Sequence, residues 1–223
     1  MVYTYASTPA HGVSLAERTS DSADLTFGYD ANGNMAQRQY FDSTGVTRTQ
    51  VLAWDAANQL AVVTQTTPSL VSQYWYDGNG TRYGRLQADG SSTTFTASPF
   101  PFFDVEWSQP GNSWQYTTHY LLNGQAIAFG IDDEEVTYLY RDQVGSVMVL
   151  TSEGVITDTR QYYAYGSKRG GDELPVDANY TEQRLDGTGL LYYGARYYDP
   201  ELGLFISPDT LIPDPTDIFS YNR

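Results

Sequence analysis

Aromatic-aspartate pairs recur at a near-constant interval in the first third of the chain. The pairs are Tyr29-Asp30, Trp54-Asp55 and Tyr76-Asp77, and successive pairs are 25 and 22 residues apart. Each pair precedes a segment rich in Asn, Gly or Ala. There the Asp carboxylate can accept backbone N–H groups, and Asn-Gly tolerates the positive φ of a tight turn. One hairpin per period in the twenties is typical of a repeat architecture, in which each unit needs its neighbours to cover it.

Short alternating runs flank these turns. Leu25, Phe27 and Tyr29 share one face of an expected strand, and no segment shows a sustained apolar stripe with the period of a helix. The regular repeats fade after about residue 87, but hairpin turns continue, with the strongest signals at Asp89-Gly90 and Asn123-Gly124. The sequence therefore predicts an all-β chain of antiparallel hairpin repeats that forms a curved, coiling sheet.

Composition narrows the function classes. The formal net charge is −15, which disfavours binding to nucleic acid or to anionic membranes and is compatible with a basic partner or simply with solubility. The chain has no cysteine, so thiolate metal sites and disulfides are excluded. No apolar run approaches the length of a membrane span, and the N-terminus lacks the features of a signal peptide. We expect no cofactor, and any targeting signal would lie outside these residues.

The chain divides into a hairpin-repeat region at residues 1–165 and a terminal region at residues 166–223. A Gly-rich and charged stretch at 166–176 is expected to be a loop. It leads into a distinct block at residues 180–209, which contains Gly189-Leu190-Leu191-Tyr192-Tyr193-Gly194-Ala195-Arg196-Tyr197-Tyr198-Asp199-Pro200 and ends in Ser207-Pro208-Asp209.

The block at residues 180–209 resembles the RHS repeat-associated core domain of bacterial YD-repeat proteins. The segment at residues 138–146 is similar to the family's lead-in to that core, and the three aromatic-aspartate units are similar to its YD repeats. The resemblance covers nearly the whole chain apart from residues 98–114. Glu182 replaces a usual glycine and Leu204 a usual arginine, and the family's later Asp-Pro-x-Gly segment does not occur before Arg223.

The resemblance implies a hollow shell of successive hairpins in a secreted or cell-surface protein, enclosing a C-terminal toxin or effector. In some members the core domain is an aspartyl autoprotease that frees this cargo. Asp209 matches a catalytic aspartate of that pattern, with Asp199, Asp214 or Asp217 as partners by nearness alone. Alternatively, Asp199 and Asp209 simply begin turns next to proline. If the core domain does cleave itself, we expect it to do so only in a longer parent chain.

Four tyrosines bracket one arginine in the terminal block. Arg196 could lie over the rings by cation–π contact, and the exposed faces could stack on a sugar. The alternative is a structural cluster that locks the last hairpins together. The candidate residues are Tyr192, Tyr193, Arg196, Tyr197 and Tyr198.

Other chemistries find little support. His11 and His119 are the only histidines, and neither a G-x-S-x-G elbow nor a phosphate-binding loop occurs. The turns at Asp30 and Asp77 imitate half of a calcium loop but lack its twelfth acidic ligand. Four acids at residues 132–135 are expected to be solvated, and no metal site is assigned. We therefore expect a non-enzymatic scaffold, with a carbohydrate- or surface-binding module as the main alternative, and homo-association through free sheet edges.

Overall fold

The computed structural model describes residues 2–5, 12–17, 24–41, 45–132 and 134–209. Sixteen strands in this part of the chain form one antiparallel sheet in which every strand pairs with its neighbours in sequence. Their bounds are β1 Val2–Tyr5, β2 Val13–Glu17, β3 Asp24–Tyr29, β4 Met35–Phe41, β5 Thr47–Trp54, β6 Leu60–Gln65, β7 Leu70–Tyr76, β8 Arg82–Ala88, β9 Thr93–Phe100, β10 Phe103–Gln109, β11 Ser113–Leu122, β12 Gln125–Ile131, β13 Thr137–Arg141, β14 Val147–Ser152, β15 Val155–Tyr162 and β16 Lys168–Gly171.

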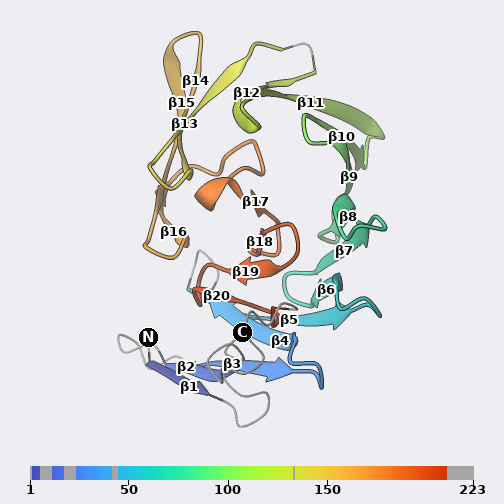
Figure 1. Ribbon diagram of the computed structural model, residues 1–223. Helices are drawn as coiled ribbons and strands as arrows, with labels where there is room; N and C mark the ends of the chain where they lie inside the picture. Colours follow the sequence, from blue (N-terminus) through green and yellow to red (C-terminus); the bar gives the residue numbers. More distant parts are fainter. Residues whose placement is uncertain (1, 6–11, 18–23, 42–44, 133, 210–223) are drawn as a thin grey trace.

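The sheet coils around the end of the described chain. Figure 1 shows the strands running around a central space, which is occupied by a smaller four-stranded sheet. This inner sheet contains β17 Arg184–Leu185, β18 Leu191–Tyr192, β19 Tyr197–Asp199 and β20 Leu204–Phe205. A single 3-10 turn, η1 Tyr180–Glu182, is the helical element of the described residues. The predicted all-β fold and curved sheet are confirmed.

The three predicted aspartate turns share one geometry. Oδ1 of Asp30 accepts backbone N–H groups two and four residues later, at 2.9 Å each, and Asp55 and Asp77 do the same. Each turn also closes with a backbone bond from the Asp N–H to the carbonyl four residues later. The carboxylate therefore replaces the ladder partners that a five-residue turn leaves unpaired.

Neighbouring turns are linked to each other at the rim of the sheet. Asn34 Nδ2 donates to Asn58 Oδ1 at 2.6 Å. Gln59 Nε2 donates to the carbonyl of Gly80 at 3.2 Å. Each hairpin turn is thus held by the next one.

The aromatic residue of each pair fastens its hairpin to an earlier strand. Tyr29 Oη donates to the carbonyl of Val13 at 2.9 Å, 16 positions back, and Tyr76 Oη donates to Leu60 across the same sequence interval. Trp54 Nε1 donates to the carbonyl of Met35, 19 positions back. The ring is partly buried while its polar tip finds a backbone acceptor, as amphipathic rings require. The two residues of each pair therefore have separate roles. The aromatic residue links one repeat to an earlier one, and the aspartate holds the backbone of its own turn.

The repeat geometry returns after the longer hairpins of β9–β12, where the sequence predicted that it would fade. Asp142 Oδ1 accepts the N–H groups of Val144 and Ser146 at 3.0 and 2.8 Å. Tyr162 Oη donates to the carbonyl of Val147, 15 positions back. The expectation of a loop at residues 166–176 was wrong for residues 168–171, because these form β16, which pairs with β15.

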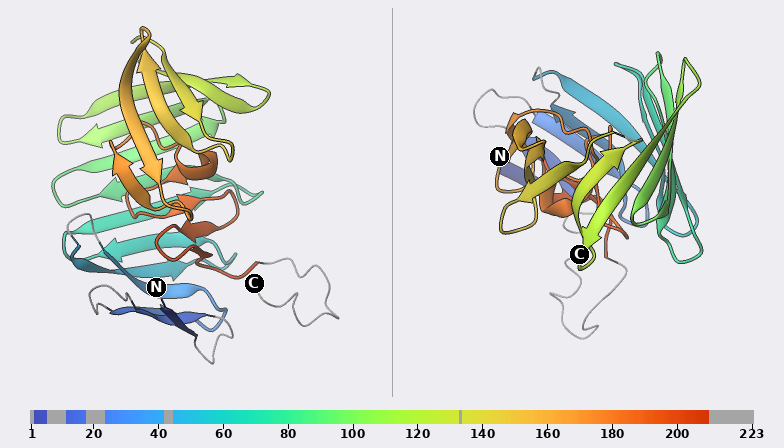
Figure 2. Two further views of the ribbon diagram at one scale, coloured as in Figure 1. Left: turned by 90° about the vertical axis from the view of Figure 1, so that its left-hand side faces the viewer. Right: turned by 90° about the horizontal axis from the view of Figure 1, so that it is seen from above.

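Two apolar clusters line the inside of the coil. The larger joins side chains of β2–β7 to the inner sheet, and includes Leu25, Leu60 and Val63 against Leu190 and Ile206. The smaller joins Phe129, Leu139, Val147 and Leu150 to the segment around Val176. The core of the protein therefore lies between the coiled sheet and the polypeptide that it surrounds (Figure 2). The division at residues 165 and 166 stays a prediction.

Candidate functional site

The interior of the coil brings together the charged side chains of the sheet and the segment at residues 172–209, which we call the interior segment. Charged groups are almost never fully buried unless they are paired. The interior holds several such pairs, each joining a strand of the sheet to the interior segment.

Arg38 on β4 is 1% exposed and points into the interior. Its Nη1 donates to Asp199 Oδ2 at 2.5 Å, its Nε donates to Gln50 Oε1 at 2.8 Å, and its Nη2 donates to the carbonyl of Thr188. Asp199 also accepts the backbone N–H groups of Glu201 and Leu202. Both charges are thus fully compensated, which is what allows an ion pair to persist without water.

A second buried network surrounds Asp186. Arg82 and Arg85 on β8 both donate to its carboxylate, at 2.5 and 2.7 Å, and Arg85 also pairs with Asp177 at 3.2 Å. Burial acts to raise the pKa of Asp186, but the charges of the two arginines outweigh it and hold the pKa below its ordinary value. The carboxylate therefore stays ionised inside the protein.

Tyrosine rings enclose the Arg82 guanidinium. It lies 4.3 Å from the ring centroid of Tyr192 and 5.8 Å from that of Tyr197, and Tyr76 Oη contacts Tyr197 Oη at 3.3 Å. Burial raises the pKa of Tyr197 well above its usual range. Tyr192 and Tyr197, which the sequence placed on a candidate sugar platform, are 8% and 2% exposed. They contact Arg82 of the sheet and face the interior.

The remaining candidates of this cluster form a separate group. Tyr193, Tyr198 and Phe205 pack against one another with centroid separations of 5.4–5.5 Å. Arg196 lies over the Phe205 ring at 3.9 Å, and its Nη2 contacts Asp209 Oδ2 at 2.9 Å. The five residues are therefore divided between two environments.

Asp209 and Asp199 have different partners. Asp209 is paired with Arg196, and its side chain is 39% exposed, whereas the side chain of Asp199 is 1% exposed and paired with Arg38. Asp214 and Asp217, the other candidates for a catalytic pair, lie outside the described residues, as does His11. The role of Asp209 in self-cleavage stays a prediction.

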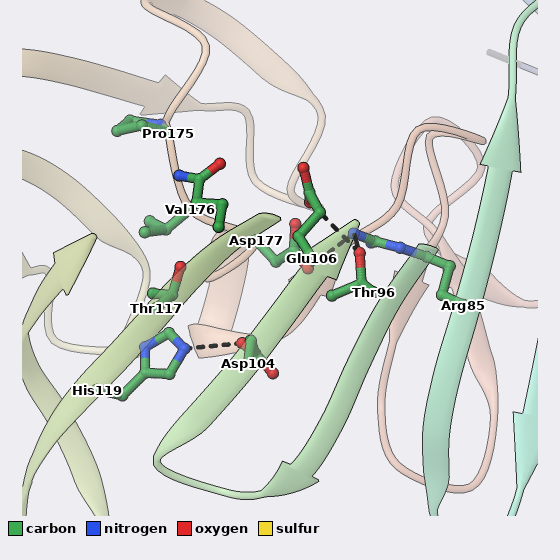
Figure 3. Close-up of a pocket in the computed structure, with 10 residues that line it drawn as sticks. Arg85, Thr96, Asp104, Glu106, Thr117, His119, Pro175, Val176 and Asp177 are labelled. Atoms are coloured by element: carbon green, nitrogen blue, oxygen red, sulfur yellow. Dashed lines mark hydrogen bonds and ion pairs between the residues drawn. The ribbon is translucent and has the colours of Figure 1, made fainter. Parts of the chain in front are cut away.

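A polar cavity of about 170 Å³ lies between β8–β11 and the interior segment (Figure 3). In it, His119 Nε2 contacts Asp104 Oδ2 at 2.8 Å, and Arg184 of β17 donates to the same carboxylate at 3.1 Å. Burial acts to raise the pKa of Asp104, but the hydrogen bond with His119 and the charge of Arg184 lower it to about 2. His119 is thus tied to an ion pair that fastens the interior segment to β10.

Sequence reasoning named Asp199, but as a possible partner of Asp209 or as a turn residue, and it missed the ion pairs that join the sheet to the interior segment. Arg38 and Asp199 are 161 positions apart, and Arg184 and Asp104 are 80 apart, so no local pattern joins them. One signal was present: Arg38 and Arg82 occupy strand positions that alternate with exposed residues. An arginine on the inward face of a strand requires an acidic partner from elsewhere.

The described residues contain neither a metal-binding cluster nor a membrane-spanning helix. No group of three or more His, Asp or Glu side chains in this part of the chain is placed to hold a metal ion. No helix among these residues is long and apolar enough to cross a membrane.

Comparison with known proteins finds relatives but no matching family model. The tRNA3(Ser)-specific nuclease WapA of Bacillus spizizenii is 27% identical over 86% of this chain, and the toxin subunit YenC1 of Yersinia entomophaga is 26% identical over 76%. Teneurin-3 of Danio rerio is 25% identical over 87%. The chain spans 8%, 21% and 7% of these relatives, respectively.

Solved structures show the same fold. The crystal structure of TcdB2-TccC3-Cdc42 matches 86% of this chain with a TM-score of 0.64 and 20% identity, over 12% of its own length. TcdB2-TccC3 without its hypervariable C-terminal region matches 84% with a TM-score of 0.65 and 19% identity. These relatives are RHS/YD-repeat proteins; this chain is similar to them in sequence and shares the coiled sheet of successive hairpins with the solved structures.

Proposed function

We propose that this chain is a wall segment of an RHS/YD-repeat shell, with no chemistry on a foreign substrate, in a secreted or cell-surface protein. In this role the coiled sheet surrounds polypeptide, namely a toxin or effector segment joined to the shell. The observation that carries the proposal is the interior segment itself: residues far along the chain lie inside the sheet and are held there by buried ion pairs.

The arrangement suits a container more than a catalyst. The titratable groups of the interior are engaged with one another: Asp199 with Arg38, Asp186 with Arg82 and Arg85, and Asp104 with His119 and Arg184. These ion pairs fix the strands of the coiled sheet to the interior segment. WapA is named a nuclease and YenC1 a toxin subunit, but the chain spans only 8% and 21% of them. We therefore propose no nuclease role for these residues.

A protection experiment tests the proposal. A protease-sensitive passenger peptide is joined after Arg223, and its rate of cleavage by proteinase K is compared with that of the same peptide joined before Met1. A sheltering interior is expected to slow cleavage of the passenger after Arg223 several-fold. Equal rates for the two passengers, with the sheet intact by circular dichroism, would contradict encapsulation.

A carbohydrate-binding role has one specific observation in its favour, on the outer face of the sheet. Residues alternate between the two faces of a strand, so the inward Asp104 and Glu106 leave Phe103 and Trp107 of β10 pointing outward. The rings of Phe103 and Tyr116 stack at 6.2 Å, and Trp114 opposite Trp107 is 57% exposed. Exposed aromatic faces of this kind mark binding surfaces.

Tryptophan fluorescence and a glycan array separate the two roles. Saturable binding of a defined sugar that is lost in Trp114→Ala would support the carbohydrate role. If no glycan on the array binds, the carbohydrate-binding role is contradicted and the shell role is retained.

A further inference from the structure

An open cavity of about 600 Å³ lies where the last strands of the sheet approach the β4–β5 side. Its lining gathers positive charge in a chain whose net charge is −15. Arg160, Lys168 and Arg169, three of the twelve basic residues, line it together with the exposed ring of Tyr163. Two acids, Glu173 and Glu201, also lie at the cavity.

Arg160 is built into this cavity. It is 4% exposed, and its Nη1 donates to the carbonyl of Asp172 at 3.1 Å and to Glu173 Oε2 at 2.6 Å. Its Nε is buried without a hydrogen-bond partner in the described part of the chain.

Glu173 shows which chemistry the cavity accepts. Its carboxylate bridges Lys168 Nζ at 2.5 Å and Arg160 Nη1 at 2.6 Å, although its side chain is 74% exposed. Another carboxylate can accept from the same two donors, Lys168 Nζ and Arg160 Nη1. No hydrogen bond or ion pair within the described ranges involves the side chain of Arg169, which is exposed beside them.

The backbone along the cavity is a strand edge. β16 pairs with β15 on one side and is the last strand of the sheet in the described chain. Ser167, Lys168, Arg169 and Gly170 line the cavity as consecutive residues. The edge of β16 therefore runs along it, and a free edge can accept an added strand through main-chain hydrogen bonds.

We propose that this cavity binds an extended acidic peptide segment, which adds to the edge of β16 and places its carboxylates on Arg160, Lys168 and Arg169. An incoming carboxylate displaces Glu173 from the two cations that it bridges. Lysine on an edge strand also discourages unspecific pairing, but that role requires neither a cavity nor a buried arginine. The inference does not depend on the shell role.

Isothermal titration of the whole chain tests the site with a synthetic hexapeptide of alternating Glu and Thr. Saturable binding is expected, and the same peptide with Gln in place of Glu is expected to bind at least about tenfold more weakly, because charge-assisted hydrogen bonds are roughly twice as strong as neutral ones. Equal binding of the two peptides would overturn the proposal.

Three variants identify the binding groups. Arg169→Gln and Lys168→Gln are expected to weaken binding several-fold, and Glu173→Gln to strengthen it, because it removes the internal competitor. Arg48→Gln, an arginine outside the cavity on β5, is the matched control and should leave the affinity unchanged. Unchanged or weaker binding by Glu173→Gln would refute displacement, and with it the proposed site.

A third titration distinguishes a peptide site from a simple anion site. Inorganic phosphate and free glutamate are expected to bind far more weakly than the peptide, since neither can pair with β16. If either matched the affinity of the peptide, the assignment of an extended segment would be wrong.

Discussion

Arg38 Nη1 and Asp199 Oδ2 lie 2.5 Å apart, and both side chains are 1% exposed. This contact joins β4 to the inner strand β19 across 161 positions of sequence. Both side chains are buried, so removing either one of them leaves the other as a charge that neither water nor protein can neutralise.

We therefore expect Arg38→Ala to lower the free energy of unfolding by about 3–5 kcal/mol, the cost of breaking a buried ion pair from one side. Urea unfolding at neutral pH measures the loss. The control Arg169→Ala, at an exposed arginine on β16, should cost about 0.5 kcal/mol or less. The double variant Arg38→Met with Asp199→Leu should be more stable than Arg38→Ala, because no charge is left unpaired. Equal stability of Arg38→Ala and the control would contradict the structural role given to the pair.

Asp104 makes stability depend on pH in the acid range. Its pKa is lowered from 3.8 to about 2 in the folded protein. The stabilisation is therefore present above pH 4 and is lost as the pH falls toward 2, and it amounts to about 2 kcal/mol. Urea unfolding of wild type and Asp104→Asn at pH values from 6 to 2 should show a difference that shrinks steadily. A difference that is constant with pH would exclude this linkage.

Tyr29 reports on the bond between repeats. Tyr29→Phe removes the donor to the carbonyl of Val13 and should destabilise the protein by about 1 kcal/mol, the net value of one hydrogen bond. Tyr138→Phe, at a half-exposed ring on β13, is the control with the same chemical change. The midpoints of thermal unfolding of the two variants are compared. Equal midpoints would show that the bond from Tyr29 to Val13 does not stabilise the protein.

The turn at Asp142 is the one that restores the repeat. Asp142→Ala leaves the N–H groups of Val144 and Ser146 without their acceptor and should cost about 1–2 kcal/mol. Asp142→Asn keeps an oxygen at the same place and should retain most of that stability. Amide hydrogen exchange at Val144 and Ser146 should accelerate in the alanine variant alone. Identical exchange in both variants would argue against the carboxylate as the organiser of this turn.

The local part of this architecture could be predicted from the sequence. Asp30, Asp55 and Asp77 form the expected turns because an aspartate and the backbone it binds lie within four residues of each other. Asp142 makes the same turn, but the aromatic-aspartate pattern does not reveal it, since Arg141 separates Asp142 from Tyr140. The turn that follows β15 begins at Tyr163, where a tyrosine occupies the aspartate position.

The interior could not be predicted in the same way. Tyr192 and Tyr197 were assigned to Arg196 because it is their neighbour in sequence, whereas the structure places Arg82 against them from β8. Which arginine reaches a ring depends on how far the sheet has curved by β8, and curvature is a property of many strands together. Sequence spacing specifies each hairpin but not the partner that coiling brings to it.

The placement of the interior segment has a consequence for synthesis. Each strand of the coil pairs with the one made just before it, so hairpins can join the sheet in the order in which the ribosome releases them. Arg38 and Arg82, however, meet Asp199 and Asp186 only after more than 100 further residues have emerged, since their partners lie 161 and 104 positions later in the chain. Until then their guanidinium groups must remain hydrated, and the nascent sheet keeps a wet inner surface. Expulsion of that water therefore has to wait until the interior segment has been made and has entered the coil.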